Sequence, residues 1–288
     1  MIKAILGSDG APNFAASIGG TAIYLDTFAI SSLAQDHRNL RQRFVGTLYN
    51  GADLLFSIAH AVEISSAKGA SSASIKTFLN ELGPYWYPVE FVVDEVITRG
   101  RGEPPGRSCF ADELLKAFFS SRTSEYSPGC GKVIDLSGQF FSLGAFIDWL
   151  APKRDETLAS CRKLDKVLSD GIGPLRAKAK QNPGWLDAVI PEPQFNRSMA
   201  ATFVRNGLMR ALISDRGYQL KKGDGIDFCH AVIASAFASF ATLDKQWKRR
   251  VESLPKPNQL AQIFYEPELE AMVTGIESQL AALGGVGR

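Results

Sequence analysis

The feature that most constrains the fold is a repeated alternation between short apolar runs and amphipathic stretches. Thr21–Leu25 is an apolar run preceded by two glycines, the pattern of a buried strand that follows a turn. In Arg38–Tyr49 charged and apolar residues recur at helical spacing, and a second apolar run, Leu54–Ile58, follows soon after. Strand, helix and strand in this order favour a parallel sheet that is covered by helices.

The alternation continues, stops and then resumes along the chain. A helix is predicted at Ser72–Leu82, before the aromatic stretch Tyr85–Tyr87. Between Arg99 and Pro193 a Gly, Arg and Pro rich linker gives way to helical stretches at Asp112–Phe119, Phe140–Leu150 and Thr157–Lys180. The later elements are expected at Met199–Ile213, Asp224–Phe240, a strand ending near Leu243, a basic helix from Lys245, a strand near Leu260–Tyr265 and a helix at Pro267–Leu283.

These elements predict an α/β fold. We expect a three-layer αβα sandwich with a central parallel sheet of about four or five strands. Residues 21–270 would form one domain, with its core at 21–98 and 193–270 and a helical insertion at 99–192. Residues 1–20 would be an N-terminal extension, and 271–288 a C-terminal helix and tail.

Charge gives no general argument for a nucleic-acid partner. The 32 basic and 30 acidic residues nearly cancel, unlike the strongly basic balance of many nucleic-acid-binding domains. Any positive surface must therefore be local.

The cysteines and the apolar segments favour a cytoplasmic protein without a membrane span. The four cysteines, Cys109, Cys130, Cys161 and Cys229, are far apart and form no CxxC pair, so we expect reduced thiols. The first twenty residues are interrupted by polar residues and a proline, which argues against a signal peptide. The apolar segment Phe228–Leu243 is short for a span, and we interpret it as a buried helix followed by a buried strand.

Four acidic residues, in the order Asp, Glu, Asp, Asp, are candidate ligands, and three of them sit at expected strand or helix ends. Asp26 and Asp244 each follow an apolar strand and precede a helix, and open parallel sheets bind ligands beyond the carboxyl ends of their strands. Asp227 falls in the first turn of a predicted helix, and Glu63 lies among apolar neighbours after the second strand. Each has a plainer explanation: helix capping for Asp26 and Asp244, a favourable helix dipole for Asp227, and a solvated helix face for Glu63.

The segments around these acids resemble the PIN-domain nucleases. Ile23–Thr27 resembles the first strand and first acid of that family, and Ala61–Ile64 resembles its second acidic motif. Asp227–Ala234 and Ala241–Asp244 are similar to its third and fourth motifs. The resemblance covers about Thr21–Val96 and Met199–Tyr265. Phe28 stands where the family commonly has Asn.

The resemblance implies a PIN-like fold and a metal-dependent nuclease. In this interpretation Asp26, Glu63, Asp227 and Asp244 are both the catalytic residues and the ligands of Mg²⁺ or Mn²⁺. RNA is the substrate that the family implies, which makes an endoribonuclease the leading hypothesis. Thr242 and Asp224 are supporting candidates, although a strand Thr is ordinary and Asp224 has a plain role as a helix cap. His230, one turn after Asp227, is interpreted as a structural residue.

Local basic clusters supply candidate contacts for a phosphate backbone. Lys221 and Lys222 precede the third acid, and Lys245 and Lys248 follow the fourth, so we assign these four lysines to nucleic-acid binding. Arg249 and Arg250 belong to the second cluster, and Arg38, Arg41 and Arg43 form another. Trp86 and Tyr87 could stack on bases but are more typical of a core.

Other site motifs are absent from the sequence, which has no GxxxxGK[ST] loop, HExxH, GxSxG or zinc-type Cys and His cluster. Two alternatives stay open. One is a PIN-fold module that binds nucleic acid or protein without cutting, for which Phe28 is an early sign. The other is a DNA structure-specific nuclease that uses the same acids. A protein partner or inhibitor, a toxin role and a homo-oligomer also stay open.

Overall fold

The computed structural model describes residues 2–284 except 7, 9–11, 17–19, 37–38, 67–69, 101–107, 124–132, 135–140, 183, 193 and 256–258. The chain divides into two compact units, which we describe separately. The first unit comprises 1–89, 110–154 and 266–288, and the second comprises 90–109 and 155–265. The expected insertion is thus shared, with 110–154 in the first unit and 99–109 and 155–192 in the second. The predicted linker at 101–107, Cys130 and Arg38 lie outside the described residues.

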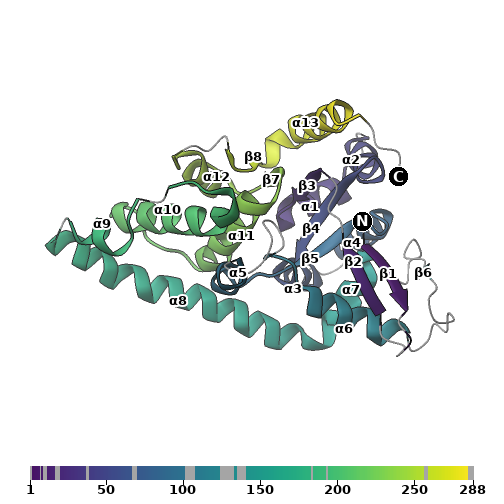
Figure 1. Ribbon diagram of the computed structural model, residues 1–288, viewed down its shortest axis with the longest axis horizontal. Helices are drawn as coiled ribbons and strands as arrows, with labels where there is room; N and C mark the ends of the chain where they lie inside the picture. Colours follow the sequence, from purple (N-terminus) through teal and green to yellow (C-terminus); the bar gives the residue numbers. More distant parts are fainter. Residues whose placement is uncertain are drawn as a thin grey trace. The chain divides into compact units, whose positions relative to one another are not determined.

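Three parallel strands form the centre of the first unit (Figure 1). They are β3 (Thr21–Tyr24), β4 (Ala52–Ser57) and β5 (Trp86–Val89), in the order β5-β4-β3. Ile23 pairs with Leu54, which in turn pairs with Trp86. Every residue of these strands is buried, which explains why they appear in the sequence as continuous apolar runs.

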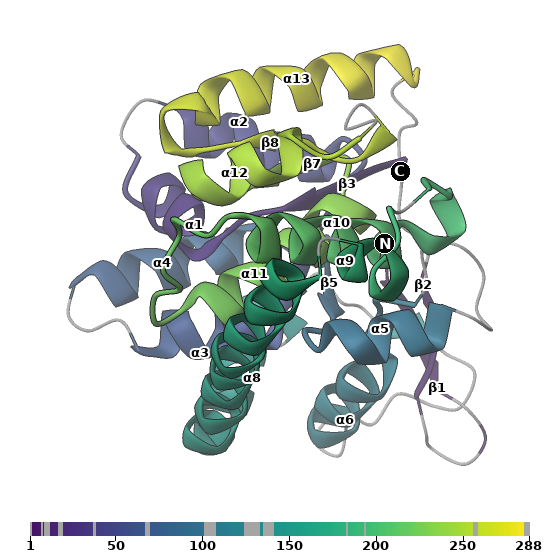
Figure 2. The same cartoon turned by 90° about the vertical axis from the view of Figure 1, so that its left-hand side faces the viewer.

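Helices of the first unit pack against these strands. They are α1 (Thr27–Ala34), α2 (Leu40–Tyr49), α3 (Ile58–Ser66), α4 (Ala70–Glu81), α6 (Asp112–Thr123), α7 (Leu143–Leu150) and α13 (Leu269–Ala282). The helix α13 lies along α2 (Figure 2), where Arg43 forms an ion pair of 2.6 Å with Glu277. On the other helices, Phe118 and Phe146 form an edge contact, and Phe146 packs on Trp86 of β5.

A small antiparallel sheet near the N-terminus was not predicted from the sequence. The strands β1 (Ile2–Leu6) and β2 (Pro12–Ala16) pair with each other, and β1 also pairs with β6 (Val133–Ile134). The interpretation of residues 1–20 as an extension therefore missed two strands.

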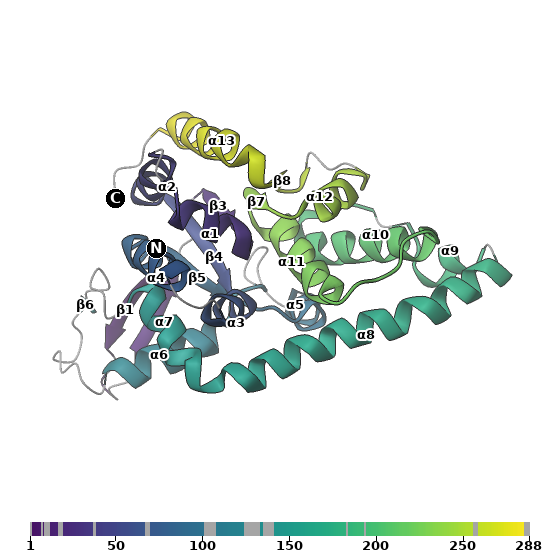
Figure 3. The same ribbon diagram turned by 180° about the vertical axis from the view of Figure 1, so that it is seen from behind.

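The second unit combines two parallel strands with a set of helices. The strands are β7 (Phe240–Thr242) and β8 (Gln262–Phe264). The helices are α5 (Val93–Gly100), α8 (Arg154–Gln181, of which Arg154 belongs to the first unit), α9 (Trp185–Val189), α10 (Ala200–Ser214), α11 (Asp224–Phe237) and α12 (Lys245–Glu252). Figure 3 shows the long helix α8 together with α10, α11 and α12, and these last three pack against one another.

The architecture confirms the predicted α/β class. The described parallel strands number three in the first unit and two in the second, and the fold is consistent with a three-layer αβα sandwich that carries a helical insertion. Phe228–Leu243 is a buried helix followed by a buried strand, as expected. Cys109, Cys161 and Cys229 are free thiols. Among the described helices, none is both long enough and apolar enough to pass through a bilayer.

Candidate functional site

Asp26 lies at the carboxyl end of β3 and begins α1. Its Oδ1 accepts a hydrogen bond of 3.0 Å from the backbone N–H of Ala29, so the carboxylate caps the helix. The side chain is half-buried. The capping explanation is therefore correct for Asp26, and a helix N-terminus also favours the ionised carboxylate that a metal ion would need.

Glu63 lies close to this point, although it comes from another helix. Its Oε2 accepts a hydrogen bond from the hydroxyl of Thr27, the residue that follows Asp26. Burial raises the pKa of the Glu63 carboxyl, and the hydrogen bond from Thr27 opposes that rise only in part. Within the first unit, Glu63 of α3 is thus hydrogen-bonded to the residue next to Asp26, near the end of β3.

In the second unit, Asp227 lies half-buried in the first turn of α11. The N-cap of this helix is Gly223, whose φ of 104° lies in the left-handed region that glycine adopts most readily. The cap hydrogen bonds come from α8, where Asp165 Oδ1 accepts from the N–H groups of Gly223 at 3.0 Å and Gly225 at 2.9 Å. No local pattern in the sequence indicates this role of Asp165.

Asp224 has a different role from the helix cap that was expected. It is buried, and its Oδ2 accepts from the hydroxyl of Tyr218 at 2.7 Å and from the N–H of Lys221 at 2.5 Å. These bonds fix the loop before α11. Burial raises the pKa of Tyr218 to about 12, and the hydrogen bond to Asp224 adds to this rise.

Asp244 is exposed at the end of β7 and begins α12. Its Oδ1 accepts from the N–H groups of Gln246 and Trp247, both at 2.8 Å, so capping explains this acid as well. Thr242 lies two residues earlier, fully buried in β7, where it pairs with Phe264 of β8. Its position is that of an ordinary strand residue.

The four acids are thus divided between the units, with Asp26 and Glu63 in the first and Asp227 and Asp244 in the second. Carboxylate oxygens are the ligands that Mg²⁺ and Mn²⁺ prefer, so the donor type fits such ions. Over the described residues, no group of three or more His, Cys, Asp or Glu side chains is arranged to hold a metal ion.

His230 is a core residue of the second unit. It is buried beside Phe91, with ring centroids 4.9 Å apart, and burial lowers its pKa to about 3. A ring in this environment stays neutral at physiological pH. The structural interpretation of His230 agrees with this placement.

The basic candidates have different surroundings. Lys221, Lys222 and Lys245 are exposed, whereas Lys248 lies over the ring of Tyr265 at 5.2 Å and 3.6 Å from Glu252. Sequence reasoning named Arg249 and Arg250 only as members of a cluster, yet both line an open groove with Lys245.

The arginine cluster of the first unit and the two aromatic candidates have other contacts. In the first unit, Arg41 pairs with Glu81 at 2.7 Å and Arg43 with Glu277. Trp86 and Tyr87 are buried, which agrees with the core interpretation of both.

Comparisons with known proteins do not extend this description. No protein-family model, curated protein or solved structure matches the chain.

Proposed function

We propose that the protein is a nuclease that uses Mg²⁺ or Mn²⁺ to hydrolyse phosphodiester bonds, and that RNA is its substrate. Asp26, Glu63, Asp227 and Asp244 would hold the metal. The observation that carries the proposal is the placement of Glu63. A carboxylate with a raised pKa is held near the end of a parallel strand by the hydroxyl of Thr27, the residue that follows Asp26, although burial disfavours its charge.

The side chains of the chain have distinct tasks in this proposal. A bound cation would favour the ionised form of Glu63, and the Thr27 hydroxyl would hold its Oε2 in place. Asp26 and Asp227 lie at helix N-termini, where the macrodipole keeps a carboxylate ionised. When bound, the metal would lower the pKa of a water molecule and neutralise charge on the phosphate.

The test is cleavage of labelled single-stranded RNA by the wild-type protein with Mn²⁺ and with EDTA, and by the Asp26→Asn and Asp227→Asn variants. Cutting should require Mn²⁺ and should fall by at least about a hundredfold in each variant. Asp170→Asn, which removes one exposed carboxylate from α8, is the matched control and should keep full activity. Full activity in a folded variant that carries both Asn substitutions would refute the site.

One alternative is favoured by a specific observation. One oxygen of Asp26 and one of Asp244 are already used in helix caps, so a structural role accounts for both acids, and a PIN-like module that binds nucleic acid or protein without cutting would need no other. Such a module would bind RNA without cleaving it under any metal condition. Matched RNA and DNA substrates would separate the proposed enzyme from a DNA nuclease.

The free, buried cysteines support our proposal that the protein is cytoplasmic.

A further inference from the structure

An open groove of about 520 Å³ lies in the second unit, beside α12 and the loop that follows α10. Lys245, Arg249 and Arg250 of α12 line it, and Asp215 and Tyr218 of the loop face them. Three cations and one carboxylate therefore share the groove.

Only one of these cations is neutralised by the carboxylate. The guanidinium of Arg250 lies 3.1 Å from Asp215 Oδ2 and 4.5 Å from the centre of the Tyr218 ring. Lys245 and Arg249 are exposed, and neither forms an ion pair with a residue that the structure describes. The groove thus keeps two cations that are available to an anionic ligand.

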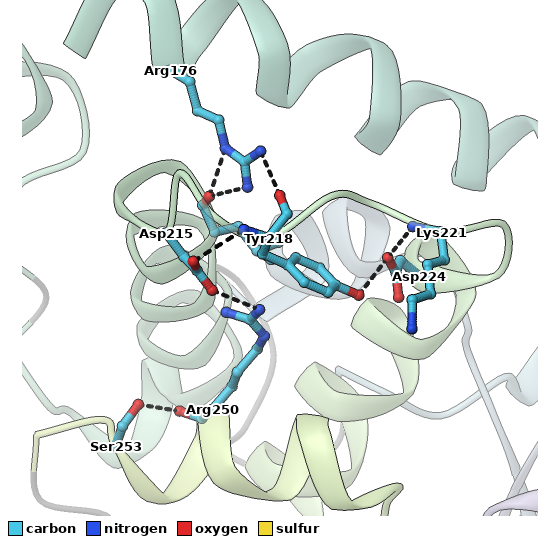
Figure 4. A network of polar contacts seen from close by, with 8 residues as sticks. Arg176, Asp215, Tyr218, Lys221, Asp224, Arg250 and Ser253 are labelled. Carbon is cyan, nitrogen blue, oxygen red and sulfur yellow. Dashed lines mark hydrogen bonds and ion pairs between the residues drawn. The ribbon is translucent and has the colours of Figure 1, made fainter. Parts of the chain in front are cut away.

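The wall of the groove is fixed by hydrogen bonds before any ligand binds (Figure 4). Arg176 of α8 donates from Nε and Nη2 to the carbonyl of Leu212, at 3.0 and 2.8 Å, and from Nη1 to the carbonyl of Tyr218, at 2.8 Å. The hydroxyl of Tyr218 donates to Asp224. A wall held in this way loses little conformational entropy when a ligand binds.

We propose that this groove binds the phosphate backbone of single-stranded RNA through Lys245 and Arg249. A guanidinium and an ammonium are suited to phosphate oxygens, and an open groove admits a chain that continues at both ends. Lys245 directly follows Asp244, so a strand in the groove passes one of the proposed metal acids. The choice of RNA rests on the proposed function, and the anionic character of the ligand rests on the groove itself.

The test measures fluorescence anisotropy of a short labelled oligouridine in EDTA, where cutting is suppressed. The variant carries Lys245→Gln and Arg249→Gln, and the control carries Lys163→Gln and Lys166→Gln, which removes the same charge from the exposed face of α8. Loss of two phosphate contacts should weaken binding by about tenfold or more and reduce the slope of log K against log salt by about 1.4. The control should bind within about twofold of the wild type, because distant charges are largely screened.

Equal affinity of the groove variant and the control would overturn the proposal, as would a wild-type protein that does not bind the oligouridine. Thermal unfolding checks that both variants are folded. If the double variant is not folded, the single Arg249→Gln variant replaces it in the test, and the expected change in the salt slope is then half as large. Failure here and failure of the nuclease proposal are distinguishable. RNA binding is measured without metal, whereas cleavage is measured with Mn²⁺ and depends on Asp26 and Asp227.

Discussion

At the scale of single residues, the buried carboxyl of Glu63 should lower the stability of the folded protein when it is ionised. Its folded pKa is raised, so the folded state holds a proton more tightly than the unfolded state does. The free energy of unfolding should therefore fall as the pH rises from the ordinary carboxyl range through the raised pKa of Glu63. Above that pKa the loss of stability should be complete. At neutral pH the charge destabilises the metal-free protein.

Replacing Glu63 with Gln should therefore stabilise the metal-free protein. The amide oxygen can still accept from the Thr27 hydroxyl, while the buried charge is gone. We expect thermal unfolding in EDTA at pH 7.5 to shift upward by about 2 °C, as about 1 kcal/mol would produce. The gain should shrink as the pH falls toward the ordinary carboxyl range, because the wild-type carboxyl then takes up its proton.

The control for this prediction is Glu192→Gln, which removes an exposed carboxylate and should leave the midpoint unchanged. A lower midpoint for Glu63→Gln at pH 7.5 would show that the charge is stabilising and would contradict the argument.

Residue positions were predictable to different extents. Asp26 and Asp244 could be placed at strand ends because the apolar run and the following helix are both local signals. The contact of Thr27 with Glu63 spans 36 positions, and the cap that Asp165 gives to Gly223 spans 58. Such contacts depend on how helices pack against one another, and the residues next to each position in the sequence do not indicate that packing.

At the scale of elements, the parallel strands were predictable because burial on both faces makes each a continuous apolar run. The strand β1 was missed because its partners are β2 and β6, and β6 is only two residues long and more than 120 positions away. The pairing that stabilises a short antiparallel strand cannot be found from local pattern alone.

The crossing of α8 and α11 gives a prediction at this scale. A Cβ on Gly225 would lie 2.4 Å from Cα and 2.9 Å from N of Asp165, and these backbone atoms cannot move aside cheaply. Gly225→Ala should therefore destabilise the protein by about 1–3 kcal/mol and disturb the cap that Asp165 provides.

Gly171→Ala is the matched comparison, because a Cβ there meets nothing within 4 Å and the residue lies inside α8. This variant should be neutral or more stable by about 0.5–1 kcal/mol, since Ala favours the helix. Urea unfolding of both variants measures the difference. Equal stabilities would mean that α8 and α11 do not approach each other so closely.

At the scale of the whole molecule, metal binding tests the four proposed acids together. A ligand that binds only the folded state stabilises it, by about 2.7 kcal/mol at a concentration one hundred times its dissociation constant. Mn²⁺ should therefore raise the unfolding midpoint of the wild-type protein by several degrees. If the four proposed acids hold the metal, Asp26→Asn and Asp227→Asn should each remove most of that rise. Asp170→Asn should keep it. A rise that disappears in only one of the two Asn variants would remove the other Asp from the proposed ligands. A wild-type protein whose midpoint does not change with Mn²⁺ would favour the noncatalytic module.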